Sequence, residues 1–120
     1  MTSSRSKYYS KKIEVNGKIF DSKKEANRYC ELLLLEKAGA ITDLQTQVPF
    51  VLIPAQYETI NGKRKCVERE CKYIADFVYT ENGRQIVEDV KGYKESTAYS
   101  VFVLKRKLML YLKNIKVIEV

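Results

Sequence analysis

Two aspartates and a lysine are the residues of this chain best suited to chemistry: Asp76, Asp89 and Lys91. They lie in two segments, 73–81 and 84–91, which are rich in β-branched and aromatic residues and flank Asn82-Gly83. This dipeptide favours a two-residue hairpin turn, because both central positions of the turn need a positive φ. The predicted pairs are Glu81 with Arg84, Tyr79 with Ile86, Val78 with Val87, Phe77 with Glu88 and Asp76 with Asp89.

This register places the two aspartates and Lys91 on one face of the hairpin and Glu88 on the other. Directly opposed side chains have Cβ atoms roughly 4.5–5.5 Å apart, and like charges at that separation destabilise a sheet. A divalent cation removes the repulsion, and Mg²⁺ is typically held by one or two carboxylates with water and phosphate oxygens. The alternative is a solvated pair at a frayed strand end. The neighbouring lysine favours the metal site.

The composition excludes several other kinds of site. The 120 residues are 45% hydrophobic and 31% charged, which indicates a single globular domain with a real core. The absence of histidine excludes catalytic triads and histidine-ligated metals. The three cysteines are odd in number and lack CxxC spacing, which argues for a reducing compartment and against disulfides or zinc. Any chemistry must therefore use carboxylates, lysine and a hard metal.

The net charge of +7 indicates a polyanionic partner, nucleic acid first. No apolar run approaches the ~20 residues of a membrane span, and the polar N-terminus does not resemble a signal peptide. We therefore expect a protein of the cytoplasm, without a membrane partner.

Turn and cap signals divide the chain into elements. Residues 1–10 are expected to be a flexible basic arm, and residues 11–120 a single domain. The expected elements are a hairpin over 12–20, a helix from Ser22 to Gly39, a hairpin of 47–59 with 64–79 around Asn61-Gly62, the Asn82-Gly83 hairpin, a helix after Gly92 and a strand over 115–120. The second helix is expected to bury a stripe of Val101, Leu104, Leu108, Tyr111 and Leu112. This order predicts an α/β fold with a mixed central sheet.

Glu25 allows two interpretations. Ser22 and Glu25 match the capping-box pattern, in which the glutamate folds back on its own helix terminus. A carboxylate in the first helical turn, at the edge of the apolar stripe, would also point into the cleft beside the two aspartates. The residues themselves leave both interpretations open.

Basic residues at three places are candidates for contact with nucleic acid. The N-terminal arm interleaves cations with tyrosines, a composition that suits phosphate contact and base stacking. A second group lies at the tip of the Asn61-Gly62 hairpin, and a third candidate lies in the first half of the second helix. A solvated surface is the alternative in each case. The residues are Lys7, Lys11, Lys12, Lys63, Arg64, Lys65 and Lys105.

The ordered set of motifs resembles the PD-(D/E)XK nuclease superfamily, including small phage-encoded nuclease-like proteins and the catalytic domains of transposon endonucleases and phage Holliday-junction resolvases. The motifs are Ser22-x-x-Glu25, Gln47-x-Pro49, Tyr73-Ile-Ala-Asp76 and Glu88-Asp-Val-Lys-Gly92. Ala75 departs from the proline that is common before the aspartate. The resemblance covers the chain from about Lys11. It implies a restriction-endonuclease-like core of order α-β-β-β-α-β, with a sheet flanked by two helices and an N-terminal hairpin.

The resemblance implies a Mg²⁺-dependent endodeoxyribonuclease, with Mn²⁺ as a substitute metal. Asp76, Asp89 and the Val90 carbonyl would be ligands, and Glu25 would complete the site directly or through water. Lys91 would orient or help deprotonate the attacking water. Gln47 would contact the substrate or a ligand. The resemblance also implies a homodimer that acts on branched DNA, in a bacterial cytoplasm if the gene is carried by a phage.

Two other hypotheses compete with a nuclease. A non-catalytic nucleic-acid-binding protein with the same fold would bind in a salt-sensitive way and never cleave. A structural or regulatory protein would not bind DNA at ~100 mM salt, where a basic protein with several phosphate contacts is still detectable. The acidic pair argues against a pure binder, because negative charge beside a phosphate weakens binding.

Overall fold

The three Asn-Gly dipeptides form tight turns in the computed structural model, which describes residues 12–92, 94 and 96–120. The asparagine and the glycine of each turn have positive φ, for example 51° at Asn82 and 77° at Gly83. Both angles suit the type I′ turn that the sequence predicts. The turns join β1 (Ile13–Val15) to β2 (Lys18–Phe20), β4 (Gln56–Ile60) to β5 (Lys63–Glu68) and β6 (Cys71–Glu81) to β7 (Arg84–Asp89).

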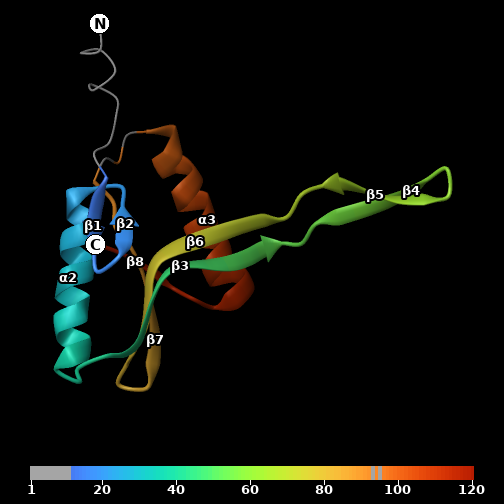
Figure 1. Cartoon of the computed structure of the whole chain (residues 1–120). Helices are drawn as coiled ribbons and strands as arrows, with labels where there is room; N and C mark the ends of the chain where they lie inside the picture. The colour runs from blue at the N-terminus through green and yellow to red at the C-terminus, as the bar shows by residue number, and fades with distance from the viewer. Residues whose placement is uncertain (1–11, 93, 95) are drawn as a thin grey trace, which may run out of the picture.

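The described residues form a mixed four-stranded sheet of order β3-β6-β7-β8 (Figure 1). β3 (Thr42–Ile53) and β7 are antiparallel to β6, and β8 (Val117–Glu119) is parallel to β7. A parallel neighbour needs a crossover connection, and a helix supplies it here. The prediction of an α/β fold with a mixed sheet is confirmed.

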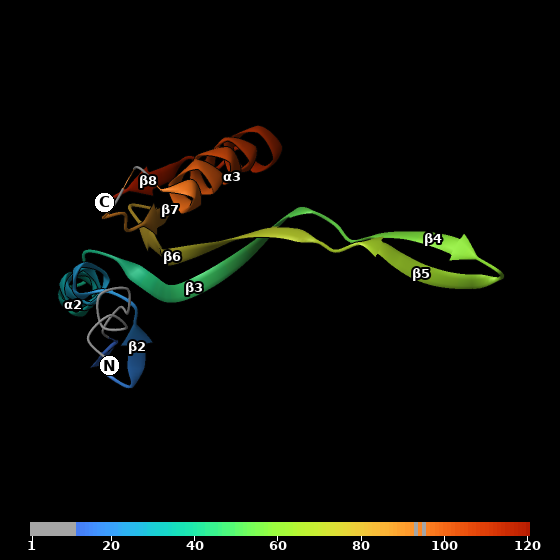
Figure 2. The ribbon, with the colours of Figure 1, turned by 90° about the horizontal axis from the view of Figure 1, so that it is seen from above.

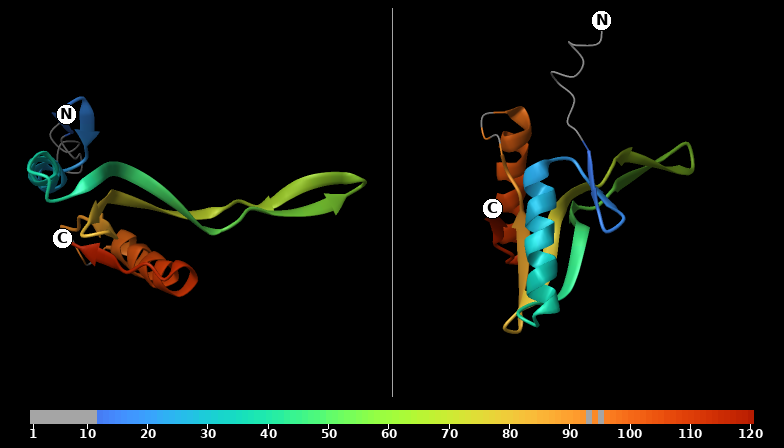
Figure 3. Two further views of the ribbon diagram at one scale, coloured as in Figure 1. Left: turned by 90° about the horizontal axis from the view of Figure 1, so that it is seen from below. Right: turned by 60° about the vertical axis from the view of Figure 1, so that its left-hand side comes forward.

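The sheet carries a helix on each face (Figure 3). α2 (Lys23–Lys37) begins after Ser22, whose hydroxyl accepts a hydrogen bond from the Glu25 amide at 3.1 Å. α3 (Thr97–Lys113) is capped in the same way by Ser96. A serine at this position satisfies one of the free amides of the first turn. The predicted start of α2 is confirmed at Ser22, and Ser96 fixes the start of α3, for which only a position after Gly92 was predicted.

The predicted core stripe of α3 is wrong at four of its five positions, and only Leu108 of the stripe packs against the core. Leu104 and Tyr111 are 59% and 85% exposed, whereas Phe102 and Met109 are buried against the sheet. Apolar residues surround this helix on several sides, so periodicity does not identify the buried face. The members of the predicted stripe that are exposed are Val101, Leu104, Tyr111 and Leu112.

Each face of the sheet has its own hydrophobic core. On the α2 side Phe20 lies 4.9 Å from the ring of Tyr29, and Tyr29 stacks on Phe77. The α3-side core contains Leu52, Tyr73, Ala75, Val78, Val87, Phe102, Met109 and Val117. Because both faces are covered, the carboxylates of β7 are buried beneath one helix or the other.

The hairpin around Asn61-Gly62 differs from its prediction. Instead of two continuous strands, the ribbon is interrupted at 54–55 and at 69–70, and β4 and β5 form a separate two-stranded sheet. Proline at position 54 has no amide to donate to a ladder, which is consistent with the interruption there. This β4–β5 arm projects away from both helices (Figures 1 and 2).

A buried ion pair joins α2 to β7. The Arg28 guanidinium donates to both carboxylate oxygens of Glu88, at 2.8 and 2.6 Å, and the Tyr79 hydroxyl donates to the same carboxylate. The Glu88 side chain is 3% exposed. This pair fixes the helix that carries Glu25 against the strand that carries Asp89.

We expect Arg28→Leu to lower the free energy of unfolding by about 3 kcal/mol, because it leaves the buried Glu88 carboxylate without its cation. Urea denaturation measures the loss. Glu70→Gln is the matched control, because it removes an exposed ion pair with Lys72 and should change the stability by less than about 0.5 kcal/mol. Equal stability of Arg28→Leu and the unmodified protein would show that the pair does not hold α2 on the sheet.

Candidate active site

The predicted register of the β6–β7 hairpin is confirmed from Glu81 opposite Arg84 to Phe77 opposite Glu88. The regular ladder ends there, one position before Asp76 and Asp89. Beyond it, the Val90 amide donates to Asp76 Oδ2 at 2.8 Å. The two aspartates therefore lie side by side on the α3 face, where the hairpin opens.

Asp76 lies at an irregularity shared by two strands. Ala75 packs in the α3-side core and Phe77 in the α2-side core, although strict alternation would put both on one face. The residues of β3 on either side of Gln47 pair with Ala75 and Phe77, so Gln47 lies opposite Asp76. Gln47 has a φ of 53°, which is uncommon for a non-glycine residue. Strained backbone of this kind concentrates at functional sites.

The carboxylate of Asp89 is held by two neighbours. The Tyr73 hydroxyl donates to its Oδ2 at 2.7 Å, and the Lys91 ammonium lies 3.4 Å from its Oδ1. Lys91 also lies 4.3 Å above the ring of Phe102, a cation–π contact. The backbone carbonyl oxygen of Lys91 accepts a hydrogen bond from the Lys24 ammonium of α2 at 2.6 Å. The position of the lysine is thus fixed through its side chain and its backbone.

Ser22 caps the helix that carries Glu25, while the partner of the Glu25 carboxylate is Gln47 in the cleft and not the helix terminus. The Glu25 amide donates to Ser22, as in a helix cap. The Glu25 carboxylate accepts a hydrogen bond from the Gln47 side-chain amide at 3.2 Å, and the same amide donates to Asp76 Oδ1 at 3.3 Å. Gln47 therefore bridges the helix carboxylate and the strand carboxylate.

Burial and the close approach of the carboxylates make negative charge at this site unfavourable. Burial, reinforced by the neighbouring Asp89 carboxylate, raises the pKa of Asp76 to about 8. Burial also raises the pKa of Glu25, with further contributions from Asp21 and Asp89 that Lys91 partly opposes. Carboxylates kept so close favour a shared proton or a bound cation.

The side chains of Glu25, Asp76 and Asp89 line an open cleft of about 360 Å³ between α2, the sheet and α3. Three lysines surround the acidic pair there: Lys91, Lys72 of β6 and Lys105 of α3. The cleft can therefore hold an anion against the lysines while its carboxylates face a cation. Lys72 was not predicted as a cleft residue, because nothing in the sequence of a strand shows which of its residues will border a cleft.

A family model described as "Protein of unknown function (DUF1064)" matches residues 5–118. The chain belongs to this family. No curated protein and no solved structure matched it. The description of the DUF1064 family names no activity.

The other predicted contact residues of this DUF1064 chain lie away from the cleft or outside the described residues. Lys63, Arg64 and Lys65 are at the tip of the β4–β5 arm. Lys12 lies 2.6 Å from Asp21 in an exposed ion pair before α2. Lys7 and Lys11 fall outside the described residues.

The cleft of the DUF1064 chain fits a hard divalent ion with an incomplete protein shell. Among the described residues, no three His, Cys, Asp or Glu side chains are arranged as a ready metal cage. Two adjacent carboxylates with room for water and phosphate are nevertheless the usual protein contribution to a Mg²⁺ site. No helix in the described part of the chain is long and apolar enough to cross a membrane.

Proposed function

We propose that this DUF1064 protein is a Mg²⁺-dependent endodeoxyribonuclease, with Mn²⁺ as a substitute metal. One observation carries the proposal: Asp76 and Asp89 lie together in an open cleft, with the Lys91 ammonium 3.4 Å from Asp89. Carboxylates without a cation repel each other, and an ammonium beside them suits a substrate that is itself an anion. A phosphodiester with a divalent ion meets both needs.

Each side chain has a role in this proposal. Asp76 and Asp89 hold the ion, with the Val90 carbonyl as a further ligand, and Glu25 completes the site directly or through water. Bound Mg²⁺ lowers the pKa of water and offsets charge on the phosphate. Lys91 positions the attacking water and stabilises the negative charge that grows on the phosphoryl oxygens. Histidine is unnecessary in such a site.

The order of elements supports a restriction-endonuclease-like core as part of the proposal. From α2 the chain passes through the β3–β4 strand, the β5–β6 strand, β7, α3 and β8. This is α-β-β-β-α-β if each interrupted strand is counted once. The β1–β2 hairpin precedes it. Membership of the PD-(D/E)XK superfamily would follow from this core and from the position of the acidic pair.

The proposal includes branched DNA as a substrate and a homodimer as the acting form. Several large apolar residues of α3 are exposed, which supports an interface between copies, since exposed apolar surface can mark an association site. Sedimentation velocity measures the association directly, and a strictly monomeric protein with full activity would remove the dimer from the proposal.

The test is cleavage of supercoiled plasmid and of a four-way DNA junction in the presence of Mg²⁺. We expect nicking that is lost with a chelator and in Asp89→Asn. Asp43→Asn is the matched control, because Asp43 is exposed and its φ of 55° is one that asparagine tolerates well. Salt-sensitive DNA binding with no cleavage under Mg²⁺ or Mn²⁺ would instead support the non-catalytic binding protein.

A further inference from the structure

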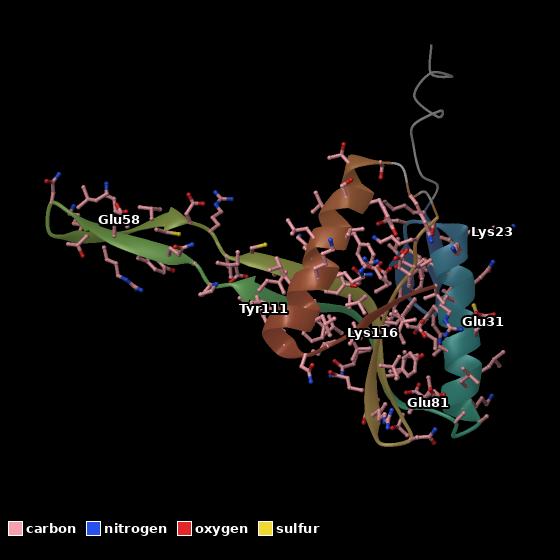
Figure 4. All side chains as sticks on the ribbon, turned by 180° about the vertical axis from the view of Figure 1, so that it is seen from behind. Lys23, Glu31, Glu58, Glu81, Tyr111 and Lys116 are labelled. Atoms are coloured by element: carbon pink, nitrogen blue, oxygen red, sulfur yellow. The ribbon has the colours of Figure 1, made fainter. Side chains whose placement is uncertain are left out.

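The β4–β5 arm has no core of its own. Every residue of β4 and β5 is exposed. Figure 4 shows Glu58 on this arm, far from α3 and from the labelled residues of α2. An isolated two-stranded ribbon is only marginally stable in water, because it cannot bury either of its faces. The arm is therefore a surface that is suited to a partner.

The charge of the arm indicates the kind of partner. Residues 38–62 contain no lysine or arginine, whereas the returning strand carries five such residues within 63–72. Three of them are consecutive at the tip, and the Arg64 guanidinium lies 3.8 Å above the ring of Tyr57, which restrains its position. Lys63, Arg64 and Lys65 lie on the arm itself, Arg69 follows it, and Lys72 lies in β6 beside the cleft. Glu68 and Glu70 accompany them.

The dimensions of the arm match those of duplex DNA. The major groove of B-DNA is wide enough to admit a two-stranded β-ribbon. The tip at Gly62 is 14 residues from Asp76 along one nearly continuous strand. At about 3.3 Å per residue it reaches as far as roughly 45 Å from the cleft. Along a duplex that rises 3.4 Å per base pair, this is about 13 base pairs.

We propose that the β4–β5 arm binds the major groove of duplex DNA about one helical turn from the cleft, with the tip cations on the flanking phosphates. The inference rests on the proposed function for its choice of DNA and goes beyond it in one respect. With the arm bound in this way, tight binding requires a long, intact duplex segment beside the reacting phosphate.

The experiment compares two triple variants in an Asp89→Asn background, so that DNA is bound and not cut. The first is Lys63→Gln/Arg64→Gln/Lys65→Gln in the arm. The control is Lys107→Gln/Lys113→Gln/Lys116→Gln, which removes the same charge from exposed positions in α3 and just after it. Affinity is measured for duplexes of 10 to 40 base pairs over a range of salt concentrations, with methylation protection of guanine N7 to detect groove occupancy.

We expect the affinity of the reference protein to rise about tenfold or more once the duplex exceeds roughly 15 base pairs. The arm variant should lose this rise and should lose N7 protection about one turn from the cleft. The slope of its log affinity against log salt concentration should be smaller by about 2.7, that is 0.9 for each of three phosphate contacts. The control should keep the length dependence and the N7 protection.

Two outcomes would overturn the proposal: equal length dependence in the arm variant and the control, or a dimer that becomes monomeric in the arm variant while DNA affinity is unchanged. The second outcome would assign the arm to self-association. Arm-dependent binding by a protein that never cleaves would remove the nuclease function and leave the arm proposal standing. Full cleavage by the unmodified protein, with DNA affinity that does not depend on the arm, would keep the nuclease function and remove the arm proposal.

Discussion

Replacing Lys91 with methionine is expected to slow DNA cleavage by about 10²- to 10⁴-fold while Mg²⁺ still binds. The range is that of a side chain that positions or transfers a proton in the transition state. Methionine has an unbranched side chain like lysine but lacks the ammonium, with its cation–π contact to Phe102 and its ion pair with Asp89. The measurement is the single-turnover rate at saturating Mg²⁺, together with the metal affinity by calorimetry.

Lys107→Met is the matched control for this prediction, because it removes one exposed cation from α3 outside the cleft. Its rate should stay within about twofold of the unmodified protein at low salt, since surface charges are screened. If Lys91→Met cleaved as fast as Lys107→Met, the ammonium would have no part in the reaction and the roles proposed for the cleft would need to be reassigned.

Asp76→Asn is expected to abolish cleavage and, at high pH without metal, to make the fold more stable. Burial beside Asp89 raises the pKa of Asp76 to about 8 from an ordinary value near 3.8. Between these two values the folded protein holds a proton that the unfolded chain has released, so stability falls as the pH rises. Asparagine removes this penalty, and we expect a gain of about 2 kcal/mol at pH 9 and almost none at pH 4.

Urea denaturation with a chelator at pH 4 and pH 9 measures this difference, with Asp43→Asn as the control. Added Mg²⁺ at 100 times its Kd should stabilise the unmodified protein by about 2.7 kcal/mol and Asp76→Asn by far less. A variant that loses stability at pH 9 in the absence of metal would show that the two aspartates do not repel each other in the fold.

The position of the acidic pair was predictable because it depends on local chemistry. An Asn-Gly turn fixes the register of its hairpin, and a one-residue shift would have moved Asp76 and Asp89 to opposite faces. The starts of α2 and α3 were fixed in the same local way, by Ser22 and Ser96. The elements that position the site therefore follow from signals that lie within a few residues of each other.

Features that depend on distant neighbours were not predictable. The buried face of α3 is set by its packing on the sheet, since Phe102 is buried and Leu104 is exposed although both side chains are apolar. A glutamine gives no indication in the sequence that its φ will be positive. In the structure the side-chain amide of Gln47 joins Glu25 to Asp76, and this contact accounts for the unusual backbone. The hairpin around Asn61-Gly62 was predicted, but its separation from the central sheet was missed, because the strands of the arm are as β-prone as those of the domain. The alternation of apolar and polar residues along a strand does not show where a two-stranded ribbon extends beyond the hydrophobic core.

The most direct test of the proposed site is to locate Mn²⁺ by anomalous scattering in crystals of the unmodified protein. We expect an ion with oxygens of both Asp76 and Asp89 at about 2.1 Å, and none in crystals of Asp76→Asn. An ion elsewhere on the protein, or no ion at these carboxylates at a pH above 8, would contradict the metal site and the hydrolase that depends on it.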